Sequence, residues 1–365
     1  MLRDILNKYE LDKSDLLYLM NLTDKDDLNM LYEKAYSIKE KFIGRKAYFR
    51  GLIEFSNVCI KDCYYCGIRK SSPQERFSMT KEEILSMAQW AYENEYGSVT
   101  LQSGERNDAE YVEFITEIIK DIKNLSDAKL GITLCLGEQS EETYQRWFDA
   151  GAHRYLLRIE TTSKELYKRI HPNDELHSLQ KRIDCLEALK KIGYQVGTGV
   201  MIGLPSQTEE DLVNDILFFK EKDIDMIGMG PYVVHKDTPM GIEVLTKNMD
   251  TEEEKAKRFE LGIKMIAITR LYLKDVNIAA TTALQALNPL GRELGLKAGA
   301  NILMPIITLQ EYRYGYQLYD NKPCIDDDQN HCKVCLTGRV LSVGDMVGFA
   351  EWGDSPHFKV KNNSK

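Results

Sequence analysis

Apolar residues recur along this chain with a helical period at its start and with a shorter period further on. Within residues 1–42, apolar side chains return at intervals of three and four, as at Leu28, Leu31, Ala35 and Ile38. This spacing places them on one face of a helix. We therefore predict a helical lead that covers one end of the domain that follows it.

From Tyr48 onward, short apolar runs alternate with longer stretches of helical period. The runs that we predict as strands are Leu52–Phe55, Ser98–Gln102, Lys129–Leu134, Arg154–Glu160, Gln195–Met201, Met226–Gly230, Ile278–Thr282 and Asn301–Met304. The stretches that we predict as helices are Lys81–Tyr96, Ala109–Asn124, Glu141–Ala150, Leu179–Ile192, Glu209–Lys222, Glu252–Tyr272 and Gly291–Gly299. This alternation predicts an α/β fold, a parallel (β/α)8 barrel of the TIM type, whose active site lies at the carboxyl ends of the strands.

The fourth predicted strand carries charge on one face. Successive side chains of a strand point to opposite faces, so Arg154, Leu156, Arg158 and Glu160 share the face that we expect to point into the barrel. Buried charge is costly unless it has a partner or a ligand. The alternatives are an Arg158–Glu160 pair that satisfies itself and a pocket for a zwitterionic ligand with hydroxyl groups; we favour the pocket.

The bulk composition excludes several classes of partner. The chain has 365 residues, enough for a barrel with extensions, and a formal net charge of −9, which argues against binding to nucleic acid or an anionic membrane. No apolar run approaches the ~20 residues of a membrane span, and Met1–Tyr9 lack the apolar core of a signal peptide. The eight cysteines then indicate metal ligands in a reducing cytoplasm rather than disulfides.

Three of these cysteines, Cys59, Cys63 and Cys66, follow the first predicted strand in a C-x3-C-x2-C spacing. Thiolates bind iron–sulfur clusters or zinc, and both centres usually take four protein ligands. Three ligands on one loop leave a position open for a small molecule. The spacing differs from that of a zinc finger, which closes with a second pair of ligands. We therefore favour a cluster over a zinc loop.

The cysteine loop resembles the signature of the radical SAM superfamily, C-x3-C-x-aromatic-C, with Tyr65 in the aromatic place. The resemblance implies a 4Fe–4S cluster whose open iron binds S-adenosylmethionine (SAM), and reductive cleavage of SAM to a 5′-deoxyadenosyl radical. Ser103, Gly104 and Glu105 resemble the Gly-Gly-Glu element with which the superfamily holds the methionyl ammonium, with serine in place of the first glycine.

Longer segments resemble the FeFe-hydrogenase maturase (HydE) family, which is close to biotin synthase. They occur in order at residues 51–69, 101–105, 154–161 (RYLLRIET), 203–212, 280–283 (ATTA), 298–305 and 316–319, so that the resemblance spans about residues 51–335. It implies that Glu105, Arg158, Glu160 and Arg182 contact SAM. It also implies that the cavity for substrate or anions is lined by Thr133, Arg154, Met226, Thr281, Thr282, Met304 and Tyr316.

The same resemblance implies the reaction and its partners. The family's proposed substrate is a small organometallic complex of iron and cysteine that carries CO and cyanide and is made by a partner maturase. Radical attack on its cysteine releases a precursor of the hydrogenase's dinuclear cluster. We accordingly expect a small-molecule substrate, an electron donor such as ferredoxin or flavodoxin and other hydrogenase maturases as partners, and neither nucleic acid nor membrane.

A second triplet, Cys324, Cys332 and Cys335, lies near the end of the chain in a C-x7-C-x2-C spacing. It resembles an optional cluster site found in part of the HydE family, which implies a second 2Fe–2S or 4Fe–4S cluster. Zinc is the rival, because His331 or water can complete a tetrahedral site, and an empty set of surface thiols is the simplest alternative. We favour iron–sulfur but assign it no part in the chemistry.

These observations predict three segments: a helical lead over 1–46, a radical SAM barrel over 47–319, and an extension over 320–365 with the second triplet. Two other functions remain open. One is a related radical SAM enzyme such as methylornithine synthase (the PylB family) or biotin synthase. The other is an iron–sulfur or zinc scaffold without enzymatic activity, although a scaffold has no need of the charged face on the fourth strand.

Overall fold

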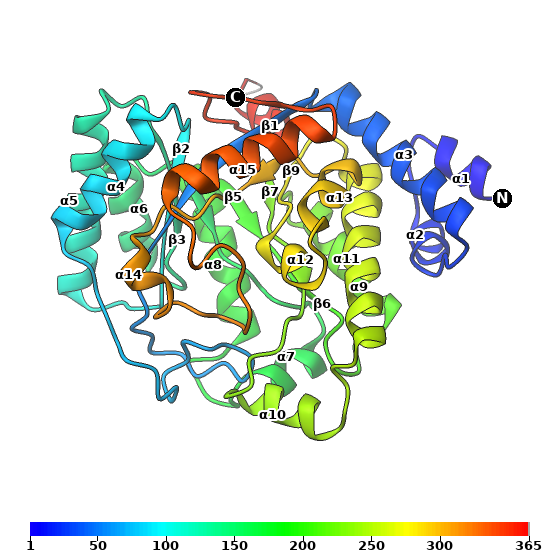
Figure 1. Ribbon diagram of the computed structural model, residues 1–365, viewed down its shortest axis with the longest axis horizontal. Coiled ribbons are helices and arrows are strands. Elements are labelled where there is room, and N and C mark those ends of the chain that lie inside the picture. The colour runs from blue at the N-terminus through cyan, green and yellow to red at the C-terminus, as the bar shows by residue number, and fades with distance from the viewer. Residues whose placement is uncertain (364–365) are drawn as a thin grey trace.

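The computed structural model, which describes residues 1–363, contains a sheet of parallel strands curled into a barrel (Figure 1). The strand order around it is β10-β1-β2-β3-β4-β5-β7-β9, and a parallel bridge between Ala279 and Ile302 joins its two ends. These strands are β1 (Lys46–Ser56), β2 (Ser98–Ser103), β3 (Gly131–Cys135), β4 (Arg154–Leu156), β5 (Gln195–Thr198), β7 (Met226–Ile227), β9 (Asn277–Ile278) and β10 (Ile302–Leu303). The predicted barrel is confirmed.

The regular part of most strands is shorter than predicted. The expected fifth and sixth strands each break in two, and their second halves, β6 (Met201–Ile202) and β8 (Gly230–Pro231), form a separate pair. The fourth strand ends at Leu156, and Glu160 adopts a left-handed φ of 64°. The seventh ends at Ile278, because Thr281 is already the N-cap of α12 (Thr282–Leu287).

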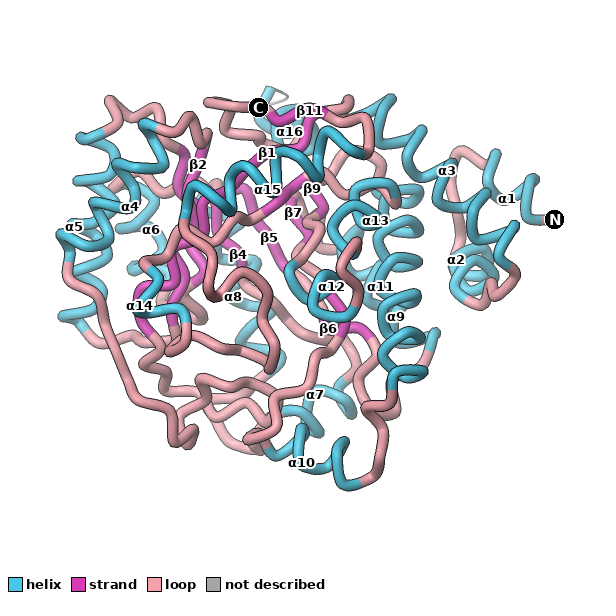
Figure 2. The backbone as a smooth tube through the Cα atoms, in the orientation of Figure 1, coloured by secondary structure: helices cyan, strands magenta, loops and turns pink. Residues whose placement is uncertain are grey.

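Helices surround the barrel, as Figure 2 shows. All seven predicted helices are present: α4 (Lys81–Glu93), α5 (Ala109–Leu125), α6 (Glu141–Asp149), α8 (Leu179–Ile192), α9 (Glu209–Glu221), α11 (Glu252–Leu273) and α13 (Gly291–Lys297). The helices that were not predicted are α7 (Lys164–Ile170), α10 (Pro239–Thr246), α12, α14 (Gln310–Arg313), α15 (Gln329–Ser342) and α16 (Pro356–Asn363). Most of these are short, and a short helix shows few periods of its apolar pattern.

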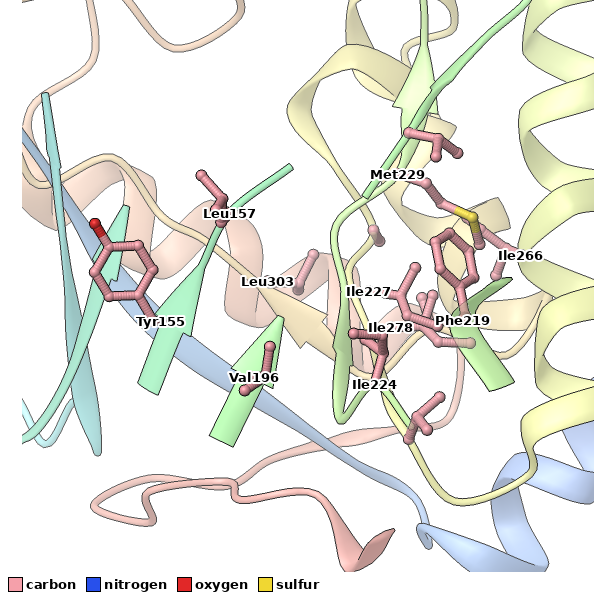
Figure 3. Packing of buried hydrophobic residues seen from close by; sticks show 14 of the residues in the cluster. Tyr155, Leu157, Val196, Phe219, Ile224, Ile227, Met229, Ile266, Ile278 and Leu303 are labelled. Atoms are coloured by element: carbon pink, nitrogen blue, oxygen red, sulfur yellow. The ribbon is translucent and has the colours of Figure 1, made fainter. Parts of the chain in front are cut away.

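Local sequence explains where the long helices begin and end. Thr80 and Glu83 form a reciprocal capping box at the start of α4, in which each side chain accepts the backbone N–H of the other residue. Helix α8 ends at Gly193, whose φ of 111° is a conformation that glycine adopts without strain. Between such ends, the apolar faces pack inward, and Phe219 of α9 meets Ile227 and Ile278 of the sheet (Figure 3).

The helical lead consists of α1 (Leu2–Asn7), α2 (Lys13–Met20) and α3 (Lys25–Phe42). The prediction that it covers one end of the barrel is wrong, because α2 packs against α9 and α3 packs against α11 and α13, on the outer side of the barrel. Lys39 of α3 forms an ion pair with Asp345 in which both side chains are fully buried. That pair joins the lead to the C-terminal part of the chain.

The C-terminal segment closes the barrel instead. β11 (Met346–Val347) pairs with the start of β1, and residues 352–354 contact residues at the amino ends of several strands. In Figure 1 this segment lies across the end of the barrel opposite α7 and α10. Within residues 1–363, no helix has the length and apolar character needed to cross a membrane. The division into three segments at residues 46 and 319 stays a prediction.

Candidate functional site

A cavity of about 350 Å³ lies inside the barrel. Its lining includes all three cysteines of the first triplet and residues from the carboxyl ends of the strands. Most residues that the sequence analysis selected line it: Tyr65, Ser103, Gly104, Glu105, Thr133, Arg158, Glu160, Arg182, Met226, Thr281, Thr282, Met304 and Tyr316. The exception among the barrel residues is Arg154. The tertiary structure therefore gathers side chains from across the whole barrel around one space.

The cysteine loop is held by hydrogen bonds to distant segments. Asn57 Nδ2 donates to the carbonyl oxygens of Glu75 and Gly315 at 2.7 and 2.8 Å. The backbone N–H of Tyr64 donates to Ile170 O at 2.9 Å, and that of Gly67 donates to Leu318 O at 3.0 Å. These contacts satisfy polar groups that a loop without regular structure would otherwise bury unpaired. The three thiols thus lie on a rigid support.

The surroundings of the three thiols are suited to a metal cluster. A Cβ atom on Gly104 would lie 2.3 Å from Val58 O and 2.8 Å from Cys59 Cβ, so glycine is needed for the β2 end to approach the loop. The backbone N–H of Glu105 donates to Cys59 Sγ at 3.3 Å. Burial raises the pKa of Cys63 to about 12. A cationic metal centre is therefore what would hold these sulfurs as thiolates.

Four buried charged groups meet beside the thiols. Lys61 Nζ lies 2.9 Å from Glu138 Oε2 and 3.2 Å from Glu105 Oε1. Arg182 Nε donates to Glu138 Oε1 at 2.8 Å, and its Nη2 donates to Glu105 Oε2 at 3.5 Å. Burial raises the pKa of Glu105; burial also acts to raise the pKa of Glu138, but Arg182 and Lys61 outweigh it and lower that pKa.

Glu105 and Arg182 were expected at the site from the sequence, whereas Lys61 and Glu138 were not. Each left a signal: Lys61 is a charged residue inside the cysteine loop, and Glu138 follows the third strand. Gly137 permits the arrangement, because a Cβ there would lie 2.2 Å from Glu105 Oε2 and because its φ is 76°.

Arg158 and Glu160 face the cavity as a pair. Arg158 donates to Glu160 Oε2 from Nη2 at 2.9 Å and from Nε at 3.2 Å, and also to Val200 O at 3.1 Å. This self-satisfied pair is the alternative that the sequence analysis weighed against a ligand pocket, and it coexists with the cavity. The Arg158 carbonyl accepts from Arg182 Nη1 at 2.9 Å, which links the pair to the four buried charges.

Arg154 does not line the cavity, contrary to the role implied by the resemblance. Its side chain is fully buried at the amino end of β4 and donates from Nε to Asp354 Oδ1 at 2.9 Å and from Nη2 to Trp352 O at 2.6 Å. Its other contact, with Thr133 Oγ1, is long at 3.4 Å. The partner that the strand pattern demanded is thus a carboxylate of the C-terminal segment, 200 residues further along the chain.

Replacing Asp354 with alanine is expected to lower the free energy of unfolding by about 3 kcal/mol, because the Arg154 charge would stay buried without a partner. Urea denaturation followed by circular dichroism measures this loss. Glu253→Ala, which breaks an exposed pair with Lys257, is the control and should change stability little. An Asp354→Ala protein as stable as the control would show that the Arg154 pair has no part in closing the barrel.

The cation that does line the cavity is Arg50, which the sequence analysis missed. It is buried and donates to Met226 Sδ at 3.0 Å and to Gly353 O at 3.4 Å, and no carboxylate among residues 1–363 forms an ion pair with it. Arg50, Leu52 and Glu54 share the inward face of β1, so the parity argument used for the fourth strand would have found them. Glu54 is paired with Lys322 at 2.5 Å.

Several polar groups of the cavity have few partners. Thr281 Oγ1 is buried without a hydrogen bond to the described residues, and so is Thr100 Oγ1. Thr282 Oγ1 accepts from Arg292 at 3.4 Å, and Tyr316 OH accepts from Gln102 at 3.3 Å. Buried hydroxyls without partners are costly. A polar ligand in this cavity would satisfy them.

Tyr65 and Ser103 contact protein groups as well as the cavity. The Tyr65 ring meets His171 edge to face at 5.6 Å between centroids. Ser103 Oγ lies 2.6 Å from both Tyr111 OH and Gly104 O. Serine in place of glycine at this position therefore anchors the end of β2.

The second cysteine triplet is only partly assembled. Cys324 and Cys332 share a hydrogen bond, which lowers the pKa of Cys332 to about 7, whereas Cys335 is exposed and hydrogen-bonded to Arg339. His331, on the first turn of α15, is largely exposed beside Asp328. In the described part of the chain, no three His, Cys, Asp or Glu side chains are placed to hold a single metal ion. A metal at this triplet stays a prediction.

Comparisons with known proteins agree with these features. The model of the radical SAM superfamily matches residues 53–219. The FeFe hydrogenase maturase subunit HydE of Thermotoga maritima is 40% identical over 356 residues, which cover 96% of this chain and 97% of that protein. The 3-methylornithine synthase of Methanosarcina acetivorans is 25% identical over 87% of this chain and 85% of its own length. The solved structure of methylornithine synthase (PylB) superposes with a TM-score of 0.79 at 23% identity, over 96% of this chain and 98% of that one, and so shares the fold.

Proposed function

Because this chain belongs to the radical SAM superfamily and, within it, to the family of the FeFe hydrogenase maturase HydE, we propose that Cys59, Cys63 and Cys66 hold a 4Fe–4S cluster beside a site for SAM. The chain is a radical SAM enzyme of the hydrogenase-maturase type. When bound, the cluster and SAM supply a 5′-deoxyadenosyl radical. The observation that carries the proposal is that three thiols and a set of paired arginines and carboxylates line one cavity.

The charged groups next to the thiols match the polar parts of SAM. Glu105 lies within the cavity and is the acceptor that we assign to the methionyl ammonium. Arg158 and Arg182 are the donors for its carboxylate, since guanidinium groups bind carboxylates in a bidentate manner. Glu160, on the same wall, is the acceptor for the ribose hydroxyls. Each of these side chains lines the cavity.

The deeper part of the cavity is the proposed substrate site. Within the described part of the chain, Arg50 has no carboxylate partner and the Thr281 hydroxyl has no hydrogen bond, so this region favours an anionic or polar ligand. Thr133, Met226, Thr282, Met304 and Tyr316 complete the wall. We propose that the ligand is a small iron–cysteine complex bearing CO and cyanide, and that the radical acts on its cysteine. Arg50 takes the place that the resemblance implied for Arg154.

The partners follow from this role. A one-electron reduction requires a donor, for which a ferredoxin or flavodoxin is the natural class, and the substrate requires another maturase to make it. We also propose that Cys324, Cys332 and Cys335 bind a second iron–sulfur cluster, which draws Cys335 toward the other two. This second site lies outside the barrel cavity and takes no part in SAM cleavage.

The proposal is tested by anaerobic reconstitution with iron and sulfide, reduction, and addition of SAM. We expect 5′-deoxyadenosine by chromatography and an EPR signal of the reduced cluster that SAM perturbs. Both results follow if SAM contacts the open iron of a cluster held by three thiolates. Absence of the product together with an unperturbed signal would contradict the proposed function.

A further inference from the structure

Two buried charged side chains beside the proposed SAM site have no part in the binding described above. Lys61 lies on the cysteine loop between Cys59 and Cys63, and Glu138 follows β3. Only 4% of the Lys61 side chain and 2% of the Glu138 side chain are exposed. Glu138 does not itself line the cavity, whereas Glu105 does. Any effect of Glu138 on a ligand must therefore pass through its neighbours.

The two carboxylates share the same two cations unequally. Glu138 accepts hydrogen bonds from both cations at 2.9 Å (Lys61) and 2.8 Å (Arg182). Glu105 has longer contacts with the same cations, 3.2 Å to Lys61 and 3.5 Å to Arg182. Charge-assisted hydrogen bonds are strongest at about 2.7–2.9 Å. The cations are therefore bound mainly to Glu138, and Glu105 is only loosely paired.

Resting on the SAM site proposed above, we propose that Glu138 and Lys61 are positioning residues for Glu105. Glu138 binds the two cations that would otherwise neutralise Glu105, so that the Glu105 carboxylate stays available to accept the ammonium group of an amino-acid ligand. Lys61 carries this effect from the cysteine loop, because it contacts both carboxylates. The charge of Glu138, which lies outside the cavity, thereby affects how tightly an ammonium group binds to Glu105 inside it.

The charges of the four groups explain why Glu138 matters. Two buried cations face two buried carboxylates, so the buried charges balance before a ligand binds; the only other cation in the described chain that pairs with either carboxylate, the exposed Lys181, lies 3.9 Å from Glu138. Without the Glu138 charge, Lys61 and Arg182 would both have Glu105 as their remaining buried counterion. An incoming ammonium would then have to displace two cations in a region of low dielectric, where such pairs are strong. Ammonium binding would weaken although Glu105 itself is unchanged.

A purely structural role is the alternative, because Lys61 also donates to the carbonyl of Leu176 and so ties two loops together. The two roles differ in whether the effect of replacing Glu138 depends on the charge of Glu105. A structural loss adds to the effect of any other substitution, whereas a role exerted through Glu105 disappears once Glu105 has lost its charge. A double-mutant cycle on Glu105 and Glu138 therefore distinguishes them.

The experiment uses the full-length protein with its iron–sulfur content reconstituted anaerobically, and measures the Kd for SAM by equilibrium dialysis together with iron content. We expect Glu138→Gln to weaken SAM binding about tenfold, the usual scale for residues that orient a ligand-binding group, with iron content unchanged. In the Glu105→Gln background, Glu138→Gln should have no further effect. An analogue of SAM with a hydroxyl group in place of the ammonium should bind wild type and Glu138→Gln alike.

Asp225→Asn is the matched control, since Asp225 is also a buried carboxylate paired with a lysine, Lys361, but lies near the amino ends of β5 and β7. It should leave the Kd for SAM unchanged. An unchanged Kd in Glu138→Gln, or a tenfold loss that persists in full in the Glu105→Gln background, would overturn the positioning role. If Glu138→Gln fails to retain iron, Glu138→Asp replaces it in the cycle, and its smaller loss must likewise vanish without the Glu105 charge. Wild-type protein that holds iron but does not bind SAM would instead overturn the proposed function, and this inference with it.

Discussion

Replacing Cys63 with alanine is expected to abolish SAM cleavage and to remove the iron of the first cluster. The cluster that we propose has three thiolate ligands on one loop, and loss of one leaves two, which is too few to hold a centre that already has an open position. Cys63 is buried, and its loop is anchored by hydrogen bonds to distant segments. Iron content and 5′-deoxyadenosine are the measurements.

Two control variants make this result specific. Cys332→Ala removes a buried cysteine of the second triplet and should reduce iron content only in part, with SAM cleavage retained. Cys185→Ala removes a buried cysteine outside both triplets, whose Sγ donates to Gln139 O at 3.8 Å, and should leave both measurements unchanged. Equal loss of SAM cleavage in Cys63→Ala and Cys332→Ala would contradict the separate roles proposed for the two triplets.

Replacing Glu160 is expected to weaken SAM binding by about tenfold to a hundredfold while leaving the iron content of the first cluster intact. A hydrogen bond to a charged group contributes about 1.5–3 kcal/mol, which corresponds to that range of affinity. Glu160 lies at the end of the cavity wall formed after β4 and is the carboxylate partner of Arg158. Its loss removes an acceptor for the ligand and leaves Arg158 without its counterion.

The choice of substitution follows from the backbone at this position. Glu160 has a φ of 64°, a left-handed conformation that is no easier for alanine or glutamine than for glutamate. Alanine removes the carboxylate and most of the side chain, whereas glutamine keeps the shape of the side chain and removes only its charge. The backbone N–H of Glu160 donates to Gly199 O at 3.0 Å and its carbonyl accepts from Met201, so the turn should persist in both variants. Glu160→Ala and Glu160→Gln are compared by equilibrium dialysis with SAM and by iron analysis. Loss of iron in Glu160→Gln would show that Glu160 supports the cysteine loop and not the ligand.

The features that sequence reasoning recovered are those that depend on neighbours in the chain. The C-x3-C-x2-C spacing places Cys59, Cys63 and Cys66 on one short loop whatever the rest of the protein does. The alternation along the fourth strand identified Arg158 and Glu160, both of which line the cavity even though the regular strand ends at Leu156. The same alternation applied to β1 would have identified Arg50 and Glu54.

The ion-pair partners of the buried charges could not be predicted from local sequence. Arg154 satisfied every local criterion for a residue of the cavity, yet Asp354 neutralises it from the C-terminal segment. Lys322, which pairs with Glu54, gave no local signal, because nothing in its neighbourhood distinguishes it from a solvent-exposed lysine. Helix α15, which carries Cys332 and Cys335, was missed, so the separation of Cys335 from the other two cysteines could not be foreseen.

The sequence by itself determined the barrel and the position of the cysteine loop, because periodicity, capping and ligand spacing act over a few residues. Most residues of the cavity wall were instead selected from the resemblance to the HydE family. Only the tertiary structure decided which charges are neutralised within the protein and which remain available to a ligand. An ion pair depends on two side chains meeting across a low-dielectric interior, and Arg154 and Asp354 are 200 residues apart. The balance among Lys61, Glu105, Glu138 and Arg182 arises in the same way, from three loops and helix α8, which only the closed barrel brings together.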